Sequence, residues 1–205
     1  MKVKKWEIAL IAAFIITILC AGSVGSVAAQ QRELSNKLIR LHVIANSDSD
    51  ADQALKLKVR DAVTGELEAM LKSSGSRDEA EETLNANLQL ISGLCEDTIR
   101  REGYDYCVSV TLGVENYPTR VYDTFSLPAG EYLSLKITIG SGEGKNWWCV
   151  VFPPVCYTAA TKEDLTEMNF SEDEVELITE DGGEQVFKFK ILEWLSDIKD
   201  FFTGR

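Results

Sequence analysis

Covalent chemistry in this sequence would depend on Cys149 and on His42, the only histidine of the chain. A cysteine thiolate can act as a nucleophile when a histidine serves as its base and a neighbour such as Asn46 orients the ring. A disulfide between Cys149 and Cys156 competes with this interpretation, because two prolines between the cysteines can reverse the chain and a bonded sulfur cannot attack a substrate. Reduced, buried cysteines are a further alternative. The sequence therefore leaves open both a thiol enzyme and a protein without catalytic residues.

Metal binding is a second kind of chemistry to weigh, because Asp48, Asp50 and Asp52 alternate along one short segment. Alternate carboxylates suit calcium, but an EF-hand loop has glycine at its sixth position and glutamate at its twelfth, where this chain has Gln53 and Val59. Negative charge at the start of a helix is the simpler explanation, since the helix dipole favours it there. A single histidine also excludes zinc sites built on two or more histidines. We therefore expect neither a metal nor a cofactor.

The glycine-rich residues 140–146 have the composition of a phosphate-binding loop without its spacing. A P-loop places four residues between its first glycine and a Gly-Lys pair that precedes Ser or Thr, whereas here three residues intervene and Asn146 follows the lysine. We interpret the segment as a flexible loop that lets Trp147 and Trp148 approach another surface. Neighbouring side chains of a strand face opposite ways, so one tryptophan can enter the core while the other is exposed. The alternative is that both belong to the core.

These residues must be positioned by strands and helices whose periods are visible in the sequence. Residues 38–45 alternate like a strand, with apolar residues on one side and Arg40 and His42 on the other. The predicted elements are a strand at 38–45, amphipathic helices at 51–72 and 77–103, strands at 106–114, 120–125 and 132–139, and a short apolar stretch at 147–156. They predict an α+β fold, in which two amphipathic helices cover an antiparallel or mixed sheet of about four to five strands, plus a C-terminal helix.

The first 29 residues have the composition of an export signal. Lys2, Lys4 and Lys5 precede an apolar run and a stretch of small residues, which is the pattern of a secretory signal peptide. The uncharged stretch up to residue 29 is also long enough, at ~1.5 Å per residue, to cross a ~30 Å hydrocarbon core as an uncleaved signal anchor. In either case we expect the lysines to stay inside the cell and the domain to be extracytoplasmic, either secreted or membrane-anchored.

Composition divides the remaining chain into three parts. Residues 30–157 hold the predicted α+β domain, residues 158–185 are rich in carboxylates, and residues 186–205 have the pattern of an amphipathic helix. We expect the middle part to be solvated or disordered. The formal net charge of -12 disfavours nucleic acid and anionic headgroups as partners, so membrane contact is expected only through the N-terminal segment. A protein partner with a basic or apolar patch fits this charge better.

Two segments of the sequence resemble the stage II sporulation protein R family of endospore-forming bacteria. One is residues 38–61, with the motif residues Arg40, His42, Asn46, Asp48 and Asp50, and the other is residues 142–154, with Asn146, Trp147, Trp148 and Cys149. The likeness covers residues 30–157. It implies a signalling protein and not an enzyme: members are made in the forespore and exported into the space between forespore and mother cell. There they activate a membrane-embedded aspartic protease that processes a sigma-factor precursor.

With this resemblance, we expect Asn146, Trp147 and Trp148 to contact the membrane-embedded aspartic protease of the adjacent cell and to favour its active, dimeric state. The resemblance supplies no catalytic residue. One alternative is an extracytoplasmic thiol or cell-wall enzyme that uses Cys149 and His42. Another is a passive carbohydrate- or peptide-binding module that uses the same tryptophans.

Overall fold

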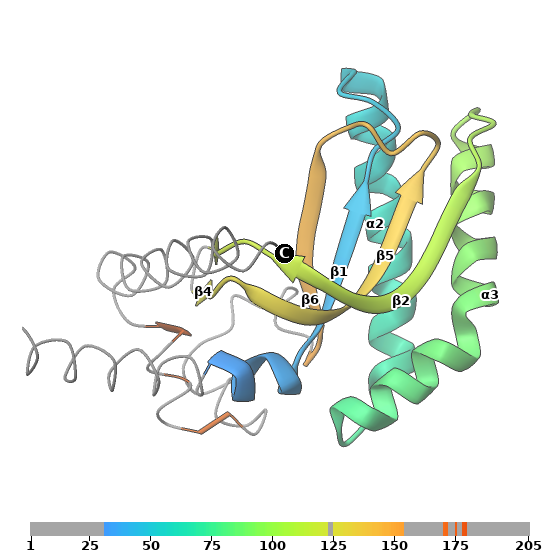
Figure 1. Ribbon diagram of the computed structural model, residues 1–205. Coiled ribbons are helices and arrows are strands. Elements are labelled where there is room, and N and C mark those ends of the chain that lie inside the picture. The colour runs from blue at the N-terminus through green and yellow to red at the C-terminus, as the bar shows by residue number, and fades with distance from the viewer. Residues whose placement is uncertain (1–30, 123–124, 154–169, 172–174, 176–177, 180–205) are drawn as a thin grey trace, which may run out of the picture.

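The computed structural model describes residues 31–122, 125–153, 170–171, 175 and 178–179, in which two long helices cover one face of a four-stranded sheet (Figure 1). The strands of this sheet are β1 (Ile39–Ile44), β2 (Val108–Tyr117), β5 (Gly130–Ile139) and β6 (Asn146–Phe152), and the helices are α2 (Asp50–Leu71) and α3 (Arg77–Arg101). Residues 31–37 form a further helical segment. The α+β prediction is confirmed, and of the two predicted forms of the sheet the mixed one is present.

Strand β1 lies inside the sheet, whose order is β2-β5-β1-β6. It runs parallel to β5, from Ile39 opposite Leu133 to Ile44 opposite Thr138, and antiparallel to β6. A parallel pair needs a long crossover, and here α2 and α3 supply it before β2 returns antiparallel to β5. Because β1 and β5 run in the same direction, the segments that follow them leave the sheet at the same end. This direction brings the glycine-rich loop to the start of α2.

Both long helices begin at a serine cap. The Ser49 side chain accepts a hydrogen bond from the Asp52 N–H, and the Ser76 side chain accepts one from the Glu79 N–H. The first helix therefore starts at Asp50, one residue before the predicted position, because the Ser49 hydroxyl supplies its cap. Two predicted acidic residues thus lie in the first turn of α2, where the helix dipole favours them.

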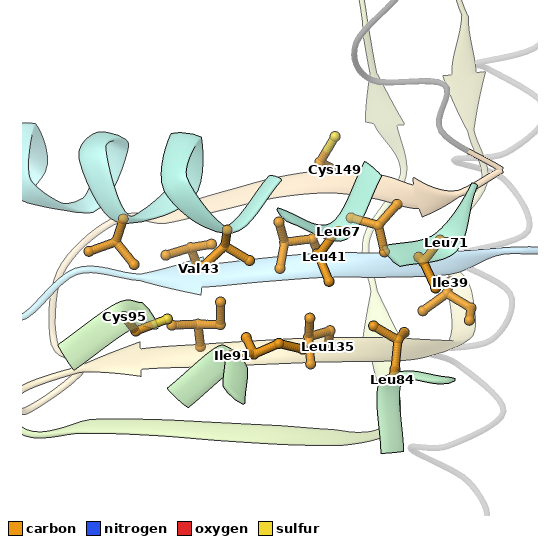
Figure 2. Close-up of a cluster of buried hydrophobic side chains, with 14 of the residues drawn as sticks. Ile39, Leu41, Val43, Leu67, Leu71, Leu84, Ile91, Cys95, Leu135 and Cys149 are labelled. Atoms are coloured by element: carbon orange, nitrogen blue, oxygen red, sulfur yellow. The ribbon is translucent and has the colours of Figure 1, made fainter. Parts of the chain in front are cut away.

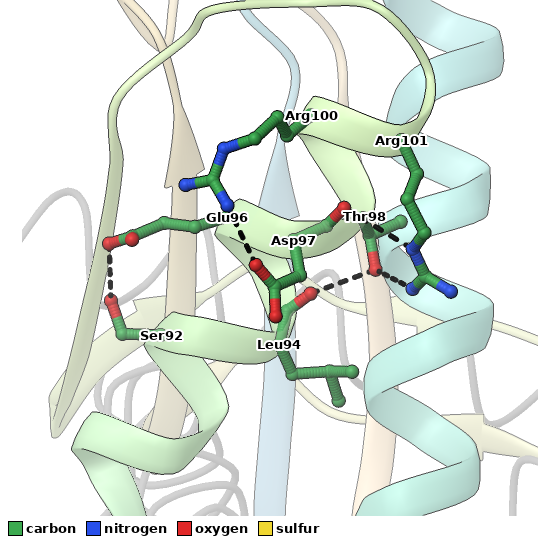
Figure 3. Close-up of polar contacts among 7 residues, drawn as sticks. All are labelled: Ser92, Leu94, Glu96, Asp97, Thr98, Arg100 and Arg101. Atoms are coloured by element: carbon green, nitrogen blue, oxygen red, sulfur yellow. Dashed lines mark hydrogen bonds and ion pairs between the residues drawn. The ribbon is translucent and has the colours of Figure 1, made fainter.

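Polar contacts within α3 support its C-terminal turns (Figure 3). Arg100 forms an ion pair with Asp97 at 2.8 Å, and Arg101 donates a hydrogen bond to the Thr98 hydroxyl at 3.1 Å. Positive side chains in a last turn also interact favourably with the helix dipole. These polar groups pair with one another within α3, so they stabilise its C-terminal end and form no separate site.

The main hydrophobic core lies between the helices and the facing side of the sheet (Figure 2). Strand β1 contributes Ile39, Leu41 and Val43, which have no exposed surface. The helix stripes predicted from the sequence complete this core with Leu55, Val59, Val63, Leu67 and Leu71 of α2 and with Leu84, Ile91, Cys95 and Ile99 of α3. Ala80 of α3 joins the core as well, which the sequence did not predict. Fully burying one large aliphatic side chain stabilises the fold by about 1.5–3 kcal/mol, so this cluster is the main source of stability.

A second cluster covers part of the opposite face of the sheet, which the sequence did not predict. Its buried members are Leu34, Leu38, Tyr117, Phe125, Leu127, Tyr132, Val150, Phe170, Val175 and Ile178. Three of these, Phe170, Val175 and Ile178, belong to the acidic segment that we predicted to be solvated or disordered, and for them that prediction is wrong. Their apolar side chains lack a clear period, yet each finds a buried position against the sheet. Strand β1 is therefore covered on both faces.

The predicted strand at 120–125 does not join the main sheet. Instead, β3 (Arg120–Val121) pairs with β4 (Ser126–Leu127) in a separate two-stranded sheet. The predicted signal segment 1–29, Cys156, most of segment 158–185 and the predicted helix 186–205 lie outside the described residues. Within the described ranges, none of the helices combines the length and apolar composition needed to cross a bilayer.

Candidate functional site at the junction of two loops

The motif residues that follow β1 meet the glycine-rich loop at one end of the sheet. We call this place the junction: the turn of residues 45–49 and the loop of residues 140–145. The backbone oxygen of Asn46 accepts hydrogen bonds from the Ser141 hydroxyl at 2.7 Å and the Glu143 N–H at 3.2 Å. Its side-chain oxygen accepts a hydrogen bond from the Ser141 N–H at 3.0 Å. Asn46 thus joins two segments that are 95 residues apart in the sequence.

Asp52 holds the turn side of the junction from the first turn of α2. One of its carboxylate oxygens accepts hydrogen bonds from the Asn46 amide at 2.9 Å and the Ser47 hydroxyl at 2.6 Å. Hydrogen bonds from Ser47 and Asn46 lower the pKa of Asp52 and outweigh the opposing effect of burial. The third carboxylate of the alternating run is therefore a buried acceptor that fixes the turn, which explains why the segment has more acids than a helix cap needs.

Lys56 holds the loop side of the junction. Its ammonium group donates hydrogen bonds to the backbone oxygen of Lys145 at 2.8 Å and to Gln53 Oε1 at 2.6 Å. The Lys145 N–H in turn donates to Asp48 Oδ1 at 2.7 Å. Burial lowers the pKa of Lys56, partly offset by the nearby charge of Asp48. The backbone of Lys145 is thus held on both sides, while its side chain is exposed.

Two glycines let the loop approach the turn this closely. A Cβ on Gly144 would overlap the backbone oxygen of Ser47, and the Gly144 N–H donates to the Ala45 oxygen at 2.9 Å. Gly140 has φ +58°, and a Cβ there would overlap the Asn46 side chain. We interpreted this segment as flexible from its glycines, and that interpretation is wrong: the glycines permit close contact, and at least six hydrogen bonds tie the loop down.

The two tryptophans of β6 face opposite sides of the sheet, as their adjacency predicted. Trp147 lies opposite Val43 on the helix side, with the Arg60 guanidinium 4.8 Å from its ring centroid. Trp148 lies opposite His42 on the other side and stacks on its ring at a centroid distance of 3.7 Å. Both tryptophans are partly buried, so neither is a fully exposed contact residue. Asn146, which precedes them, is exposed.

His42 is buried between polar partners from both sides of its strand. Its Nδ1 lies 3.2 Å from Glu115 Oε2, and its Nε2 lies 2.9 Å from Asn146 Oδ1. Burial raises the pKa of Glu115, but hydrogen bonds from Lys136 and Ser134 together with the nearby His42 outweigh it, so the pKa is lowered overall. His42 therefore connects the edge strand β2 to the residue at the start of β6.

Arg40 is fully buried on the same face as His42, without an acidic partner among the described residues. Its guanidinium carbon lies 3.8 Å from the ring centroid of Tyr117 and 4.8 Å from that of Tyr132, and Nη2 donates to the Tyr122 hydroxyl at 2.7 Å. Burial raises the pKa of both Tyr117 and Tyr132, which keeps the rings neutral beside the cation. Cation–π contacts of this kind stabilise a desolvated guanidinium.

Residues 35–162 match the model of the family described as Stage II sporulation protein R (spore_II_R). The chain belongs to this family. It is also 34% identical over 186 residues to Stage II sporulation protein R of Bacillus subtilis (strain 168), an alignment that covers 80% of this chain and 83% of that protein. No solved structure matches the chain.

In this member of the stage II sporulation protein R family, the motif residues have two different places. Asn46, Asp48 and Asn146 lie at or beside the junction, whereas Arg40 and His42 are buried on the face of the sheet away from the helices. Asp50 is the exposed first residue of α2. The motif residues are therefore divided between the junction and the buried face of β1, and only some of them reach the surface.

The thiol enzyme considered from the sequence is not assembled by this geometry. Cys149 lies opposite Leu41 in the helix-side core, whereas His42 is on the other face against Trp148. Cys149 is also disulfide-bonded, while Cys95 and Cys107 are free. The predicted partner Cys156 lies outside the described residues, so that pairing stays a prediction. The pairing of Cys149 with His42 as nucleophile and base is therefore wrong.

Sequence reasoning missed three residues that are central here: Asp52 as an acceptor, Lys56 and Glu115. Asp52 and Lys56 are buried charged residues on a helix, and both point toward the junction. In the sequence, each of them is a charged residue next to the apolar stripe of the helix. The helical period alone does not distinguish such a buried charged residue from one that faces solvent. Glu115 was missed because the predicted strand ended at Val114, whereas β2 continues to Tyr117 and Glu115 is its only charged residue. Within the described part of the chain, no group of three or more His, Cys, Asp or Glu is placed to hold a metal ion.

Proposed function

We propose that this chain is an exported intercellular signalling protein of sporulation, which activates a membrane-embedded aspartic protease of the adjacent cell. The protease then processes a sigma-factor precursor. Membership of the stage II sporulation protein R family supports the role in sporulation. The lysines and apolar run of residues 1–29 support export of the domain, either secreted or anchored. We propose the space between forespore and mother cell as its destination, which the family resemblance implies.

The contact surface that we propose for the protease is the exposed part of the junction. The observation that carries this proposal is that the loop backbone is hydrogen-bonded on the inside while several side chains at the junction are exposed on the outside. Asp48, Ser141, Glu143, Lys145 and Asn146 are exposed there, and Trp147 lies next to them with Arg60 over its ring. We call these residues the junction surface. We expected Asn146, Trp147 and Trp148 to contact the protease. The proposed surface keeps Asn146 and Trp147 but includes Lys145 and not Trp148, because Trp148 faces the second cluster.

A fixed surface suits an activator for a thermodynamic reason. A ligand shifts the equilibrium between inactive and active protease only by the difference between its affinities for the two states, and ~1–3 kcal/mol is typical of such coupling. A loop that had to become ordered on binding would lose part of this free energy. The hydrogen bonds that Asn46, Asp48 and Lys56 make to the loop hold it in place before contact. More of the binding free energy is then available to stabilise the active, dimeric state of the protease relative to the inactive state.

The experiment combines the full chain with the membrane protease and its precursor substrate in one expression host and follows cleavage of the precursor by immunoblot. Cleavage that depends on this chain is the expected result. Equal cleavage with and without the chain would refute the function.

Two variants test the contact surface within the same assay. Lys145→Glu reverses an exposed charge without removing the backbone groups that hold the loop, and Trp147→Phe keeps most of the buried ring while removing the indole edge. Both should lower precursor cleavage. Lys72→Glu is the matched control, because Lys72 is exposed at the other end of α2 and undergoes the same charge change. If the chain activates but both junction variants act like Lys72→Glu, the function stands and the contact surface is wrong.

A further inference from the structure

Strand β2 forms an open edge of the main sheet. It is ten residues long and pairs with β5 along its whole length, from Val108 opposite Ile139 to Tyr117 opposite Gly130. Among the described residues, no strand pairs with its other side. Half of the backbone N–H and C=O groups of an edge strand point away from the sheet, so they form a ready template for another strand.

This edge lacks the features that usually prevent strand addition. Edge strands of soluble proteins are commonly short, bulged, or interrupted by lysine or proline. Strand β2 has the sequence VSVTLGVENY, without lysine or proline, and its register with β5 is continuous. The pairing of β1 with β6, by contrast, contains a register shift between Ile39 and Arg40. As far as the described residues extend, the open edge is therefore long, regular and unprotected.

The charge of the edge differs from that of the chain as a whole. The chain has a formal net charge of -12, so most pairs of surfaces from two copies repel each other. In β2 the only ionisable side chain apart from the Tyr117 phenol is Glu115, which pairs with Lys136 at 2.8 Å and with His42 at 3.2 Å. Two copies can bring these edges together without opposing unpaired charges.

The edge is also complementary to itself. An antiparallel pair of identical strands is related by a two-fold axis, so each side chain row meets its own copy. On the helix side of β2 this row contains Val108, Val110, Leu112 and Val114, and Val114 has 66% of its surface exposed. Cross-strand pairs of β-branched and aliphatic residues stabilise such pairing. We propose that β2 pairs antiparallel with β2 of a second copy, which makes one continuous sheet through a two-fold dimer.

The consequence for activation rests on the function proposed above. Strands β2 and β6 are at opposite edges of the sheet, so pairing through β2 leaves the junction surface next to β6 uncovered in both copies. A two-fold dimer would then present two equivalent contact surfaces to a protease whose active state is dimeric. Binding through two linked sites raises the effective concentration of the second contact, which favours the paired protease.

The test measures the mass of the purified full chain in mild detergent by sedimentation velocity over a range of concentrations. We expect a monomer–dimer equilibrium. Val114→Lys should weaken it about tenfold or more, because a lysine at the edge is one of the features that block strand pairing. Val121→Lys is the matched control, since Val121 is 62% exposed in β3 and undergoes the same change. This control should dimerise like the unaltered chain.

Hydrogen exchange locates the interface independently of mass. Amides of β2 should become more protected as the concentration of the unaltered chain rises, and this increase should be absent in Val114→Lys. A chain that remains monomeric at every concentration overturns the proposal. So does a dimer whose affinity Val114→Lys leaves unchanged, or one whose added protection lies outside β2. None of these outcomes involves the protease, so the dimer can fail while the activating function stands.

Discussion

The hydrogen bonds that Asp52 accepts at the junction lead to the sharpest prediction about stability. Asp52 is 5% exposed and accepts hydrogen bonds from the Asn46 amide at 2.9 Å and the Ser47 hydroxyl at 2.6 Å. Hydrogen bonds to a charged acceptor contribute about 1.5–3 kcal/mol each, and those that share one oxygen are not additive. We therefore expect Asp52→Ala to lower the free energy of unfolding by about 2–4 kcal/mol.

The measurement is urea unfolding of the full chain at neutral pH, followed by tryptophan fluorescence, to which Trp147 and Trp148 contribute two of the four tryptophans. Asp50→Ala is the matched control, because Asp50 is exposed in the same turn of α2 and acts mainly through the helix dipole. That control should cost about 1 kcal/mol or less. If the two alanine variants lose the same free energy, Asp52 does not hold the turn and the account of the junction is wrong.

The pH dependence of the same measurement isolates the charge of Asp52. Its pKa in the folded state is lowered from the ordinary 3.8, chiefly by the hydrogen bonds from Ser47 and Asn46. A carboxyl group whose pKa is lower in the folded state than in the unfolded state stabilises the fold fully above its unfolded-state pKa. This stabilisation is lost as the pH falls through its folded-state pKa. Asp52→Asn does not titrate, so the stability difference between it and the unaltered chain should be constant near neutral pH and shrink on acidification. A difference that persists unchanged below the folded pKa would contradict this assignment.

Two further predictions follow from the glycines and the cysteines. Gly144→Ala should abolish precursor cleavage while leaving the helical circular dichroism intact. The reason is that the new Cβ would overlap the Ser47 oxygen and displace the loop but not the core. Full activation by this variant would show that the loop position does not matter. In native protein at neutral pH, iodoacetamide should label Cys107 rapidly and Cys95 hardly at all, since Cys107 is exposed whereas burial raises the pKa of Cys95 to about 12. Peptide mass spectrometry measures both, and equal labelling would contradict the burial of Cys95.

The helices and their core stripes could be predicted because the information is local. The capping pair of Ser76 and Glu79 and the three- and four-residue spacing of the apolar side chains lie within one segment. The direction of pairing was not predictable in the same way. Nothing near residues 39–44 specifies that this strand lies between β5 and β6, because those neighbours are about a hundred residues away.

The environment of Arg40 and His42 was hidden for a related reason. Their alternation with apolar residues is typical of a strand with one solvated face. That face is instead covered by Tyr117, Tyr132 and Phe170, which come from distant segments. The glycine-rich loop gave a misleading signal because glycine permits close packing as well as flexibility. Only its partners, Ser47 and Asn46, decide between the two.

The place of β1 in the sheet has a consequence for how the protein is made. Its two neighbours, β5 and β6, are synthesised long after β1 and both helices. Contacts with so large a sequence separation form slowly, because the intervening loop must close first. If the polypeptide is exported from its N-terminus, as proposed above, this central strand has no sheet to join until β5, which ends at Ile139, has been synthesised. The order of the strands therefore delays completion of the main sheet until most of the described domain has been synthesised.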